Sequence, residues 1–297
     1  MQAQASTIEA PTSAITLRAG TPADADQCGR IFFDAFESIA SRHNLPVEPG
    51  SPEFTRFKSA QMLAGGGFSS ILAEHEGEIL GSAFLDERAS VVGVGPVTVA
   101  PCAQDAGVGR LLMEAALRRE RARGVAGIRL VQTTYHYRSL ALYAKLGFVV
   151  REPLSVLQGA PARLSAVGIA VRAAGEQDID ACDELCRRVH GHDRHHELSD
   201  AVGAEAAMVA QRSGRISAYA TGFGYGWHAV AETNEDLLAL IGSAEAFIGL
   251  GIIVPSRNAE LLRWCLEHGL RIVQQSTLMT IGLYNEPAGA YLPSILY

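Results

Sequence analysis

The chain has 297 residues, of which 48% are hydrophobic and 19% charged, and its formal net charge is −7. The length is that of two ordinary domains, and the apolar content is too high for a largely disordered chain. The acidic balance gives no electrostatic basis for binding nucleic acid or an anionic membrane. The sequence also contains no apolar run long enough to cross a bilayer.

The start of the sequence and its cysteines bear on location. The first residues carry neither basic side chains nor an apolar segment, so we expect no secretory signal. The five cysteines are odd in number and include no CxxC pair, which favours reduced thiols. We therefore expect a cytoplasmic protein.

The first half alternates strands and helices. A helix begins at Thr21 and Pro22, because threonine caps helices and proline suits their first position. The turn Glu76-Gly77-Glu78 joins two antiparallel strands. The expected strands cover residues 15–18, 70–74, 79–85, 91–100, 127–132 and 148–151, and the expected helices begin at residue 22 and cover 54–62, 108–123 and 137–145.

The most informative stretch covers residues 93–117. A β-branched run at 97–99 leads through a loop with Gly107 and Gly109 into a helix. The first N–H groups of a helix lack intrahelical partners and lie at the positive end of its dipole, so this turn suits a phosphate or pyrophosphate. A Cβ at either glycine would hold the phosphate oxygens away from the backbone. An ordinary strand-to-helix connection has similar glycines, so the loop alone is weak support.

Two short motifs make the pattern more specific. Residues 104–110 read Q-x-x-G-x-G-R, and residues 139–148, on the helix after the next strand, read SLALYAKLGF. In this order and spacing they resemble the acetyl-CoA pyrophosphate motif and the following helix of the GNAT N-acetyltransferase superfamily. The resemblance implies a fold of the α/β class. In this fold a mixed β-sheet, of the α+β kind, is flanked by helices.

The resemblance also implies how acetyl-CoA is bound. The strand over 91–100 is splayed from its neighbour and pairs through its backbone with the pantetheine arm, an irregularity that Gly93, Gly95 and Pro96 supply. From the later helix, Ser139 reaches the cofactor together with Tyr143. The other expected contacts are Val97, Thr98, Val99, Gln104, Asp105, Ala106, Gly107, Val108, Gly109 and Arg110.

Acetyl transfer to an amine requires a polarised thioester carbonyl, a deprotonated amine and a proton for the thiolate. The resemblance places the backbone of Val99 at the carbonyl and makes Tyr143 the general acid, although a packing tyrosine would fit the same pattern. His136 replaces the family's usual asparagine, and it either keeps a hydrogen bond, acts as a base or faces solvent. Asp86 and Glu87 are the nearest acidic candidates for the base, but a solvated strand end fits them better, and a water chain is the alternative.

The second half resembles the first. Residues 168–172 and 174–180 are similar to residues 15–18 and 20–26. Residues 232–237 read ETNEDL, without the phosphate-binding motif, which is similar to tandem GNAT proteins with a degenerate C-terminal domain. The expected elements are strands over 206–211, 216–222, 227–232, 251–254 and 272–281 and helices over 234–248 and 258–269. The expected organisation is a flexible N-terminus over 1–13, an N-terminal GNAT acetyltransferase domain over 14–155, a linker over 156–166 and a degenerate GNAT-like domain over 167–297.

The acceptor is the least specified part of the hypothesis. We expect the primary amine of a small molecule or an amino-acid-like compound, with the second domain forming one wall of its pocket. An acetyl-CoA-binding sensor without turnover is the alternative, and a second domain over the cleft disfavours a polypeptide acceptor. We expect a monomer or a homodimer. The candidate wall residues, each equally suited to a core, are Phe32, Phe36, His43, Phe54 and Trp227.

A cluster of histidines raises the question of a metal. His190, His192, His195 and His196 are close in sequence, but their spacing puts no three of them on one helical face with a carboxylate. We therefore expect no metal site. Arg194, within the cluster, is a candidate anchor between the two halves or for an anionic group on the acceptor.

Overall fold

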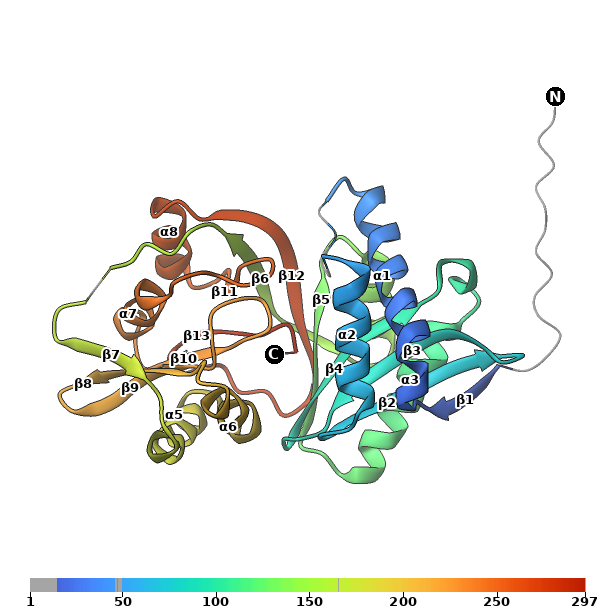
Figure 1. The fold of residues 1–297 in the computed structure, drawn as a ribbon, viewed down its shortest axis with the longest axis horizontal. Helices are drawn as coiled ribbons and strands as arrows, with labels where there is room; N and C mark the ends of the chain where they lie inside the picture. The colour runs from blue at the N-terminus through green and yellow to red at the C-terminus, as the bar shows by residue number, and fades with distance from the viewer. Residues whose placement is uncertain (1–14, 46, 48–49, 165, 297) are drawn as a thin grey trace. The chain divides into compact units, whose positions relative to one another are not determined.

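The computed structural model describes residues 15–45, 47, 50–164 and 166–296 (Figure 1). The contacts divide the chain into two compact units. Unit 1 holds the residues up to Leu85 and Pro96–Arg119, and unit 2 holds Asp86–Gly95 and the residues from Glu120 onward. The predicted flexible segment, residues 1–13, lies outside the described residues. Of the described helices, none has both the length and the apolar character needed to cross a bilayer.

Unit 1 is a sheet with helices on both faces. Its strands follow the order β1-β2-β3-β4, and β4 continues from unit 2. The predicted hairpin is confirmed, because Glu76 and Gly77 adopt positive φ of 50° and 84° between β2 and β3, as a two-residue turn requires. Its elements are β1 (Thr16–Ala19), η1 (Pro22–Asp24), α1 (Ala25–Arg42), α2 (Pro52–Leu63), β2 (Phe68–His75), β3 (Glu78–Asp86), β4 (Val91–Val99), η2 (Pro101–Ala103) and most of α3 (Val108–Arg123).

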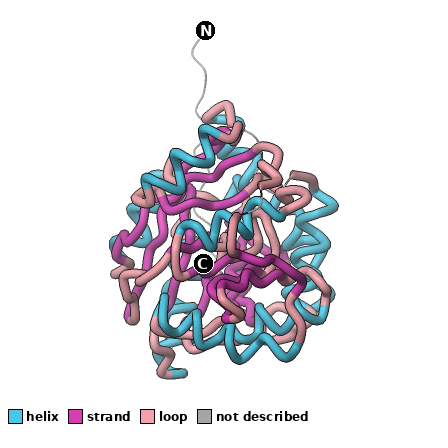
Figure 2. Tube along the Cα trace, turned by 90° about the vertical axis from the view of Figure 1, so that its left-hand side faces the viewer, coloured by secondary structure: helices cyan, strands magenta, loops and turns pink. Residues whose placement is uncertain are grey.

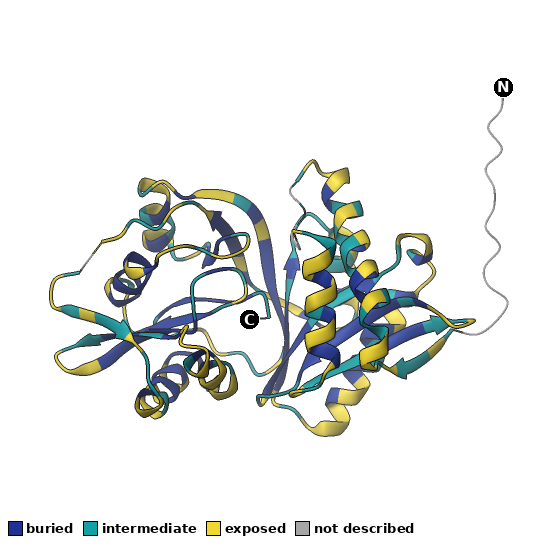
Figure 3. Cartoon of the chain, in the orientation of Figure 1, coloured by how far each residue is buried: buried dark blue, intermediate teal, exposed yellow. Residues whose placement is uncertain are grey.

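Alternation along the strands of unit 1 builds two cores. Leu72 packs with residues of α1 and α2, and its neighbour Ala73 packs with residues of α3. Successive residues of a strand point to opposite faces of the sheet, so adjacent apolar residues pack against different helices. Figure 3 shows the outcome, with buried strands and helices that are buried along one side only.

Unit 2 contains two strand-helix-strand segments that interleave. The first is β5 (Gly127–Thr133), α4 (Tyr137–Lys145) and β6 (Val149–Gln158), and the second is β11 (Ile252–Pro255), α8 (Ala259–Glu267) and β12 (Arg271–Gly282). The strand order is β4-β5-β12-β6-β11. Thus β12 inserts between the two strands of the first segment, and β6 inserts between the two strands of the second.

A second sheet of unit 2 has the order β13-β10-β9-β8-β7. Val209 packs with residues of α5 and α6, whereas Ala210 packs with residues of α7, so helices cover both faces (Figures 1 and 2). The elements are β7 (Ile169–Ala173), η3 (Glu176–Asp178), α5 (Ile179–His190), α6 (His195–Gly203), β8 (Met208–Arg212), β9 (Arg215–Ala220), β10 (Ala229–Ala231), α7 (Asn234–Ser243) and β13 (Ala290–Leu292). The predicted mixed α/β class, with sheets flanked by helices, is confirmed.

Several predicted boundaries differ from the observed ones. β6 continues to Gln158 instead of ending at Arg151, because β12 and β11 flank it on both sides. The predicted helix 234–248 ends at Ser243, and the sequence did not indicate α6 or β13. The compact units also divide the chain elsewhere than at the predicted linker 156–166, since β12 and β11 pair with strands of the first half.

Candidate active site

The loop between β4 and α3 is fixed at its start by two hydrogen bonds. The amide of Ala100 donates to the carbonyl of Leu80 at 2.8 Å, and the Nε2 amide of Gln104 donates to the carbonyl of Val99 at 3.4 Å. Gln104 was predicted to contact the cofactor, which stays a prediction, and its described bond ties the loop to the end of the strand. The loop is therefore positioned by β3 and β4.

The rest of this loop can hold an anion. Asp105 and Gly107 have positive φ of 69° and 83°, and residues 105–107 are exposed. A Cβ placed on Gly107 would meet no atom within 4 Å, so the space beside this backbone is open. The first turn of α3 carries no acidic side chain, and its first N–H groups lack intrahelical partners. Loop and helix terminus together thus offer backbone donors and a positive dipole end to a phosphate.

Strand β4 has the irregularity expected of a splayed strand. Its parallel register with β5 comprises Val91↔Gly127 to Gly93↔Arg129, although β4 itself continues to Val99. Gly95 follows with a φ of 157°, which a side chain rarely adopts. The side chain of Thr98 is buried and hydrogen-bonds to that of Ser82, with 2.9 Å between the hydroxyl oxygens. A ligand can therefore contact Thr98 only through its backbone.

Helix α4 brings three predicted residues together within unit 2. The Nδ1 atom of His136, the residue preceding the helix, lies 2.5 Å from the Ser139 hydroxyl. Ser139 in turn hydrogen-bonds to Tyr143, which is buried and packs 5.9 Å from the ring of Phe148. Burial raises the pKa of Tyr143 to about 12, so its hydroxyl is protonated at neutral pH. His136 is half-buried and bonded, which contradicts a plain solvent-facing role.

A cavity lies wholly within unit 2. Its apolar part is formed by Val91 and Gly93 of β4 and by Leu296, whose carbonyl oxygen would lie 3.0 Å from a Cβ on Gly93. Its charged part comes from the β3–β4 turn, β5 and the start of α6. The charged lining residues are Asp86, Arg88, Arg129, Arg194 and Glu197.

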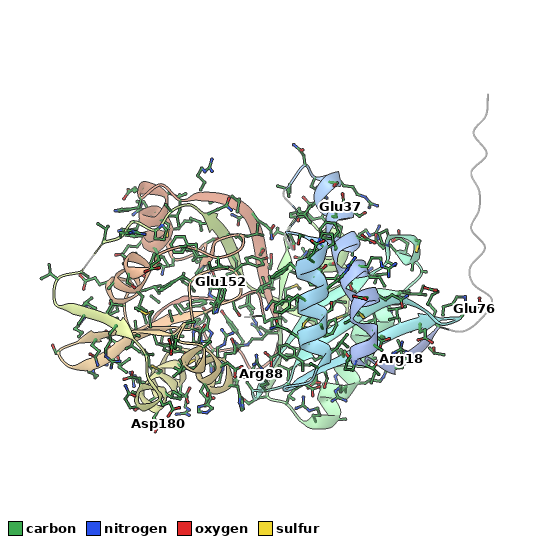
Figure 4. All side chains as sticks on the ribbon, in the orientation of Figure 1. Arg18, Glu37, Glu76, Arg88, Glu152 and Asp180 are labelled. Atoms are coloured by element: carbon green, nitrogen blue, oxygen red, sulfur yellow. The ribbon has the colours of Figure 1, made fainter. Side chains whose placement is uncertain are left out.

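The carboxylates of this cavity are held by arginines. Arg88, labelled in Figure 4, binds both oxygens of Asp86 at 2.6 and 2.8 Å. Arg194 binds both oxygens of Glu197 at 2.6 and 2.9 Å and donates to the Ser294 hydroxyl at 3.0 Å. The charge of Arg194 and a hydrogen bond to a histidine hold the pKa of Glu197 at about 2 against its burial, so it is ionised at neutral pH.

The interpretation of Asp86 and Glu87 as a solvated strand end is wrong. Asp86 is not a solvated strand end but a buried side chain, and Glu87 contacts Arg123 at 3.3 Å with its side chain only 10% exposed. Arg194 anchors Glu197 and Ser294 within unit 2, where burial of an arginine favours internal pairing. The sequence interpretation of Arg194, an anchor between the two halves or for an anionic group on the acceptor, stays a prediction.

The predicted wall residues belong to both units. Phe32 and Phe36 are half-buried on α1 with ring centroids 5.2 Å apart, and His43 is exposed after the same helix. Phe54 is 47% exposed on α2. Trp227 belongs to unit 2 and packs against Gly222, where a Cβ would lie 2.7 Å from the indole ring.

The histidine cluster makes local contacts. His195 Nδ1 lies 2.6 Å from an oxygen of Asp183, and His192 Nδ1 lies 3.0 Å from the carbonyl of Asp193. Burial lowers the pKa of His190 well below its usual value and that of His192 to about 4. The described residues contain no group of three or more His, Cys, Asp or Glu side chains arranged to hold a metal ion.

Sequence reasoning missed Arg129 and Leu296 as lining residues. Arg129 is 1% exposed in the middle of β5, where the sequence reads as an apolar strand, Gly127-Ile-Arg-Leu-Val-Gln132. A single arginine within such a run is the signal that was available, because arginine is rarely fully buried. Leu296 reaches the cavity only through the tertiary fold, so no local pattern indicates it.

We compared the sequence and the fold with those of known proteins. Residues 67–150 match the model of the acetyltransferase (GNAT) domain. The fold resembles a candidate acetyltransferase from Pyrococcus horikoshii, with 20% identity, a TM-score of 0.68, and coverage of 97% of this chain and 94% of that one. It also resembles a GCN5-related N-acetyltransferase from Sphaerobacter thermophilus, with 17% identity, a TM-score of 0.63, and coverage of 92% and 98%.

A third similar structure is a tandem GNAT protein from the clavulanic acid biosynthesis pathway, with 11% identity, a TM-score of 0.55, and coverage of 90% of this chain and 98% of that one. The comparison with curated proteins returns no match. The fold is thus shared over nearly the whole chain, while the sequence match is confined to the first half. Residues 67–150 of this chain are therefore an acetyltransferase domain of the GNAT type.

Proposed function

We propose that the chain is an acetyl-CoA-dependent N-acetyltransferase acting on the primary amine of a small or amino-acid-like molecule. The observation that carries this proposal is the loop before α3, where Gly107 has a φ of 83° and open space beside its backbone. In the reaction the amine nitrogen attacks the thioester carbonyl carbon and loses a proton. The carbon–sulfur bond breaks, and the CoA thiolate takes up a proton.

The donor is proposed to bind through backbone groups. The N–H groups at the start of α3 hold its pyrophosphate, and residues 97–99 of β4 pair with its pantetheine arm. Thr98 contributes only its backbone, because its hydroxyl is bonded to Ser82. The N–H of Val99 or of a neighbouring residue polarises the thioester carbonyl.

Tyr143 is proposed as the donor of the proton that the thiolate receives. Its high pKa keeps the phenol protonated, and its bond to Ser139 fixes the direction of the hydroxyl. Ser139 also contacts His136, so a chain of hydrogen bonds leads from the phenol to the residue before α4. We assign Ser139 and His136 to positioning this phenol, and the catalytic role to Tyr143.

Catalysis is proposed to reside in the first half, with a degenerate second half. Helices α4 and α8 end with the same backbone hydrogen bond. The N–H of Phe148 donates to the carbonyl of Tyr143, and the N–H of Leu270 donates to the carbonyl of Cys265, both at 3.0 Å. The second segment thus carries a buried cysteine in place of the tyrosine. We propose that Cys265 does not replace the phenol, because an S–H group is a much weaker hydrogen-bond donor than a phenol hydroxyl.

Two measurements on the full chain test the proposal. Calorimetry with acetyl-CoA tests donor binding, and a thiol reagent detects CoA released in the presence of a broad panel of primary amines. Binding together with amine-dependent release supports the proposal. Binding without release for any amine favours a sensor, and absence of binding contradicts the assignment of the loop.

A further inference from the structure

The segment that follows β13 is fixed within unit 2 by polar and apolar contacts. The hydroxyl of Ser294 accepts a hydrogen bond from the guanidinium of Arg194 at 3.0 Å, and the N–H of Ile295 donates to the carbonyl of Tyr225 at 3.0 Å. The side chain of Ile295 packs against buried residues of β6, β11 and β12. The next residue, Leu296, therefore follows two anchored positions.

Leu296 lies against the backbone of β4, at the place where β4 separates from β5. The described pairing of these two strands ends at Gly93↔Arg129. A Cβ on Gly93 would lie 3.0 Å from the carbonyl oxygen of Leu296, and a Cβ on Gly95 would lie 3.5 Å from its Cδ2 atom. Glycine at position 93 thus allows the two backbones to approach closely, and the Leu296 side chain extends over Gly95.

This contact divides β4 into two parts. Gly93 and Leu296 line the cavity of unit 2, whereas Gly95 is not among its described lining residues. Residues 97–99, which are proposed to hold the donor, follow on the same strand. A strand rises by about 3.3 Å per residue, so Gly95 precedes Val97 by roughly 7 Å. Leu296 therefore covers the part of β4 that leads from the cavity to the donor-binding residues.

The chemistry of Leu296 restricts what it can do to a ligand. It is half-buried and lines the cavity with a purely aliphatic side chain, whereas Asp86, Arg88 and Glu197 in the same lining are charged. Without a charge or a hydrogen-bonding group, the side chain acts on a ligand only through its size and its apolar contacts. A wall of this kind discriminates between ligands by their width.

We propose that Leu296 is a specificity-determining residue that limits the width of the acceptor between its amine and the part that enters the cavity. This inference rests on the proposed function, because the amine must reach a thioester held at residues 97–99. A narrow chain passes beside Leu296, whereas an aromatic ring at the same place meets its methyl groups. Leu296→Ala removes the three outer carbon atoms of the side chain and opens this passage.

The test compares primary amines of equal length and different width on the full chain. The pairs are hexylamine with phenethylamine, aminohexanol with tyramine, and aminoheptanoate with aminoethylbenzoate. Their far ends are apolar, polar or charged, because the cavity lining contains apolar residues and charges of both signs. For each pair, kcat/KM is measured from the CoA released. We expect the unaltered protein to prefer the narrow member about tenfold or more, as pocket discrimination by a few carbon atoms predicts.

Variants assign this preference to one side chain. Leu296→Ala is expected to reduce it about tenfold by raising kcat/KM for the wide members, and Leu296→Trp is expected to increase it. Leu296→Val removes less of the side chain and should shift the preference in the direction of Leu296→Ala. It decides the matter if Leu296→Ala does not fold. Leu266→Ala is the matched control, because Leu266 is 44% exposed on α8 of the same unit and should not affect the preference.

Calorimetry with acetyl-CoA separates an effect on the acceptor from one on the donor. The affinity should be the same in all variants, because residues 97–99 are unchanged. A folded Leu296→Ala or Leu296→Val protein with the original preference overturns the inference, and so does an unaltered protein without a preference. A loss of acetyl-CoA affinity that accounts for the changed rates also overturns it. Acetylation of no amine by the unaltered protein removes the proposed function, and the inference with it.

Discussion

The guanidinium of Arg172 binds both carboxylate oxygens of Asp178, at 2.6 and 2.8 Å, and Arg18 binds Asp24 in the same way at 2.8 and 2.9 Å. In both pairs the arginine is the next-to-last residue of the first strand of its half, and the aspartate also accepts a backbone N–H three residues before it. The similarity seen in the sequence between the two halves is thus also a similarity of contacts. Each pair joins a strand to the helix that follows it.

Asp178→Asn tests what this ion pair contributes. The bond to Arg172 holds the pKa of Asp178 below its usual value, so its stabilisation is present above pH 3.8 and is lost as the pH falls through the folded-state pKa. We expect the variant to lose about 1–2 kcal/mol of unfolding free energy at pH 7, since the pair is partly exposed but Asp178 also accepts the N–H of Gly175. The deficit should be smaller at pH 3.

Denaturant unfolding across this pH range measures the deficit. Asp180→Asn is the matched control, because Asp180, labelled in Figure 4, is exposed on α5, the helix that begins directly after Asp178. A deficit of Asp178→Asn that stays constant from pH 7 to pH 3 would show that the ion pair is not its cause.

Gly107→Asp tests the phosphate-binding loop. A carboxylate at this position repels the donor's phosphates, so we expect acetyl-CoA binding to disappear in calorimetry. Gly107 has a φ of 83°, and the new side chain adds backbone strain of about 1 kcal/mol. Gly124→Asp is the control for that strain, because Gly124 has a φ of 68° and equally open space after the other end of α3. Retained affinity in Gly107→Asp, or equal loss in both variants, would contradict the assignment.

Tyr143→Phe tests the proton donor. The substitution removes only the hydroxyl, so we expect turnover to fall by about 10²-fold or more while the affinity for acetyl-CoA changes little. Tyr137→Phe, at a position that is 70% exposed on the same helix, should keep its rate. A near-normal rate for Tyr143→Phe would contradict the role of proton donor and would show that Tyr143 serves only in packing against Phe148.

Features fixed by local chemistry were predictable, and features fixed by tertiary pairing were not. The hairpin at Glu76 and Gly77 and the loop at Gly107 follow from backbone conformations that few residue types adopt. The insertion of β12 between β5 and β6 joins segments far apart in the sequence, and no local pattern specifies it. The buried state of Asp86 has the same origin, because Asp86 lines a cavity together with Glu197 and Leu296, which are distant in the sequence.

Deletion of the residues after Ala166 tests this interleaved sheet. β12 pairs with β5 from Ser276↔Thr133 to Gly282↔Gly127 and with β6 from Arg271↔Gln158 to Thr280↔Val149. Without it, both strands expose unpaired backbone groups at their edges, and buried side chains such as Leu154 and Val156 lose their cover.

We therefore expect the fragment 1–166 to aggregate, as measured by size-exclusion chromatography. Co-expression with the fragment 167–297 should restore a soluble particle, because the missing strand is then supplied by a second chain. As a control, the full chain is given a protease site after Ala166 and cut after folding. The two pieces of the cut protein should stay together, because β12 remains hydrogen-bonded to β5 and β6 after the covalent link is cut. A soluble, monodisperse fragment 1–166 that binds acetyl-CoA would show that the first half completes its sheet without β12.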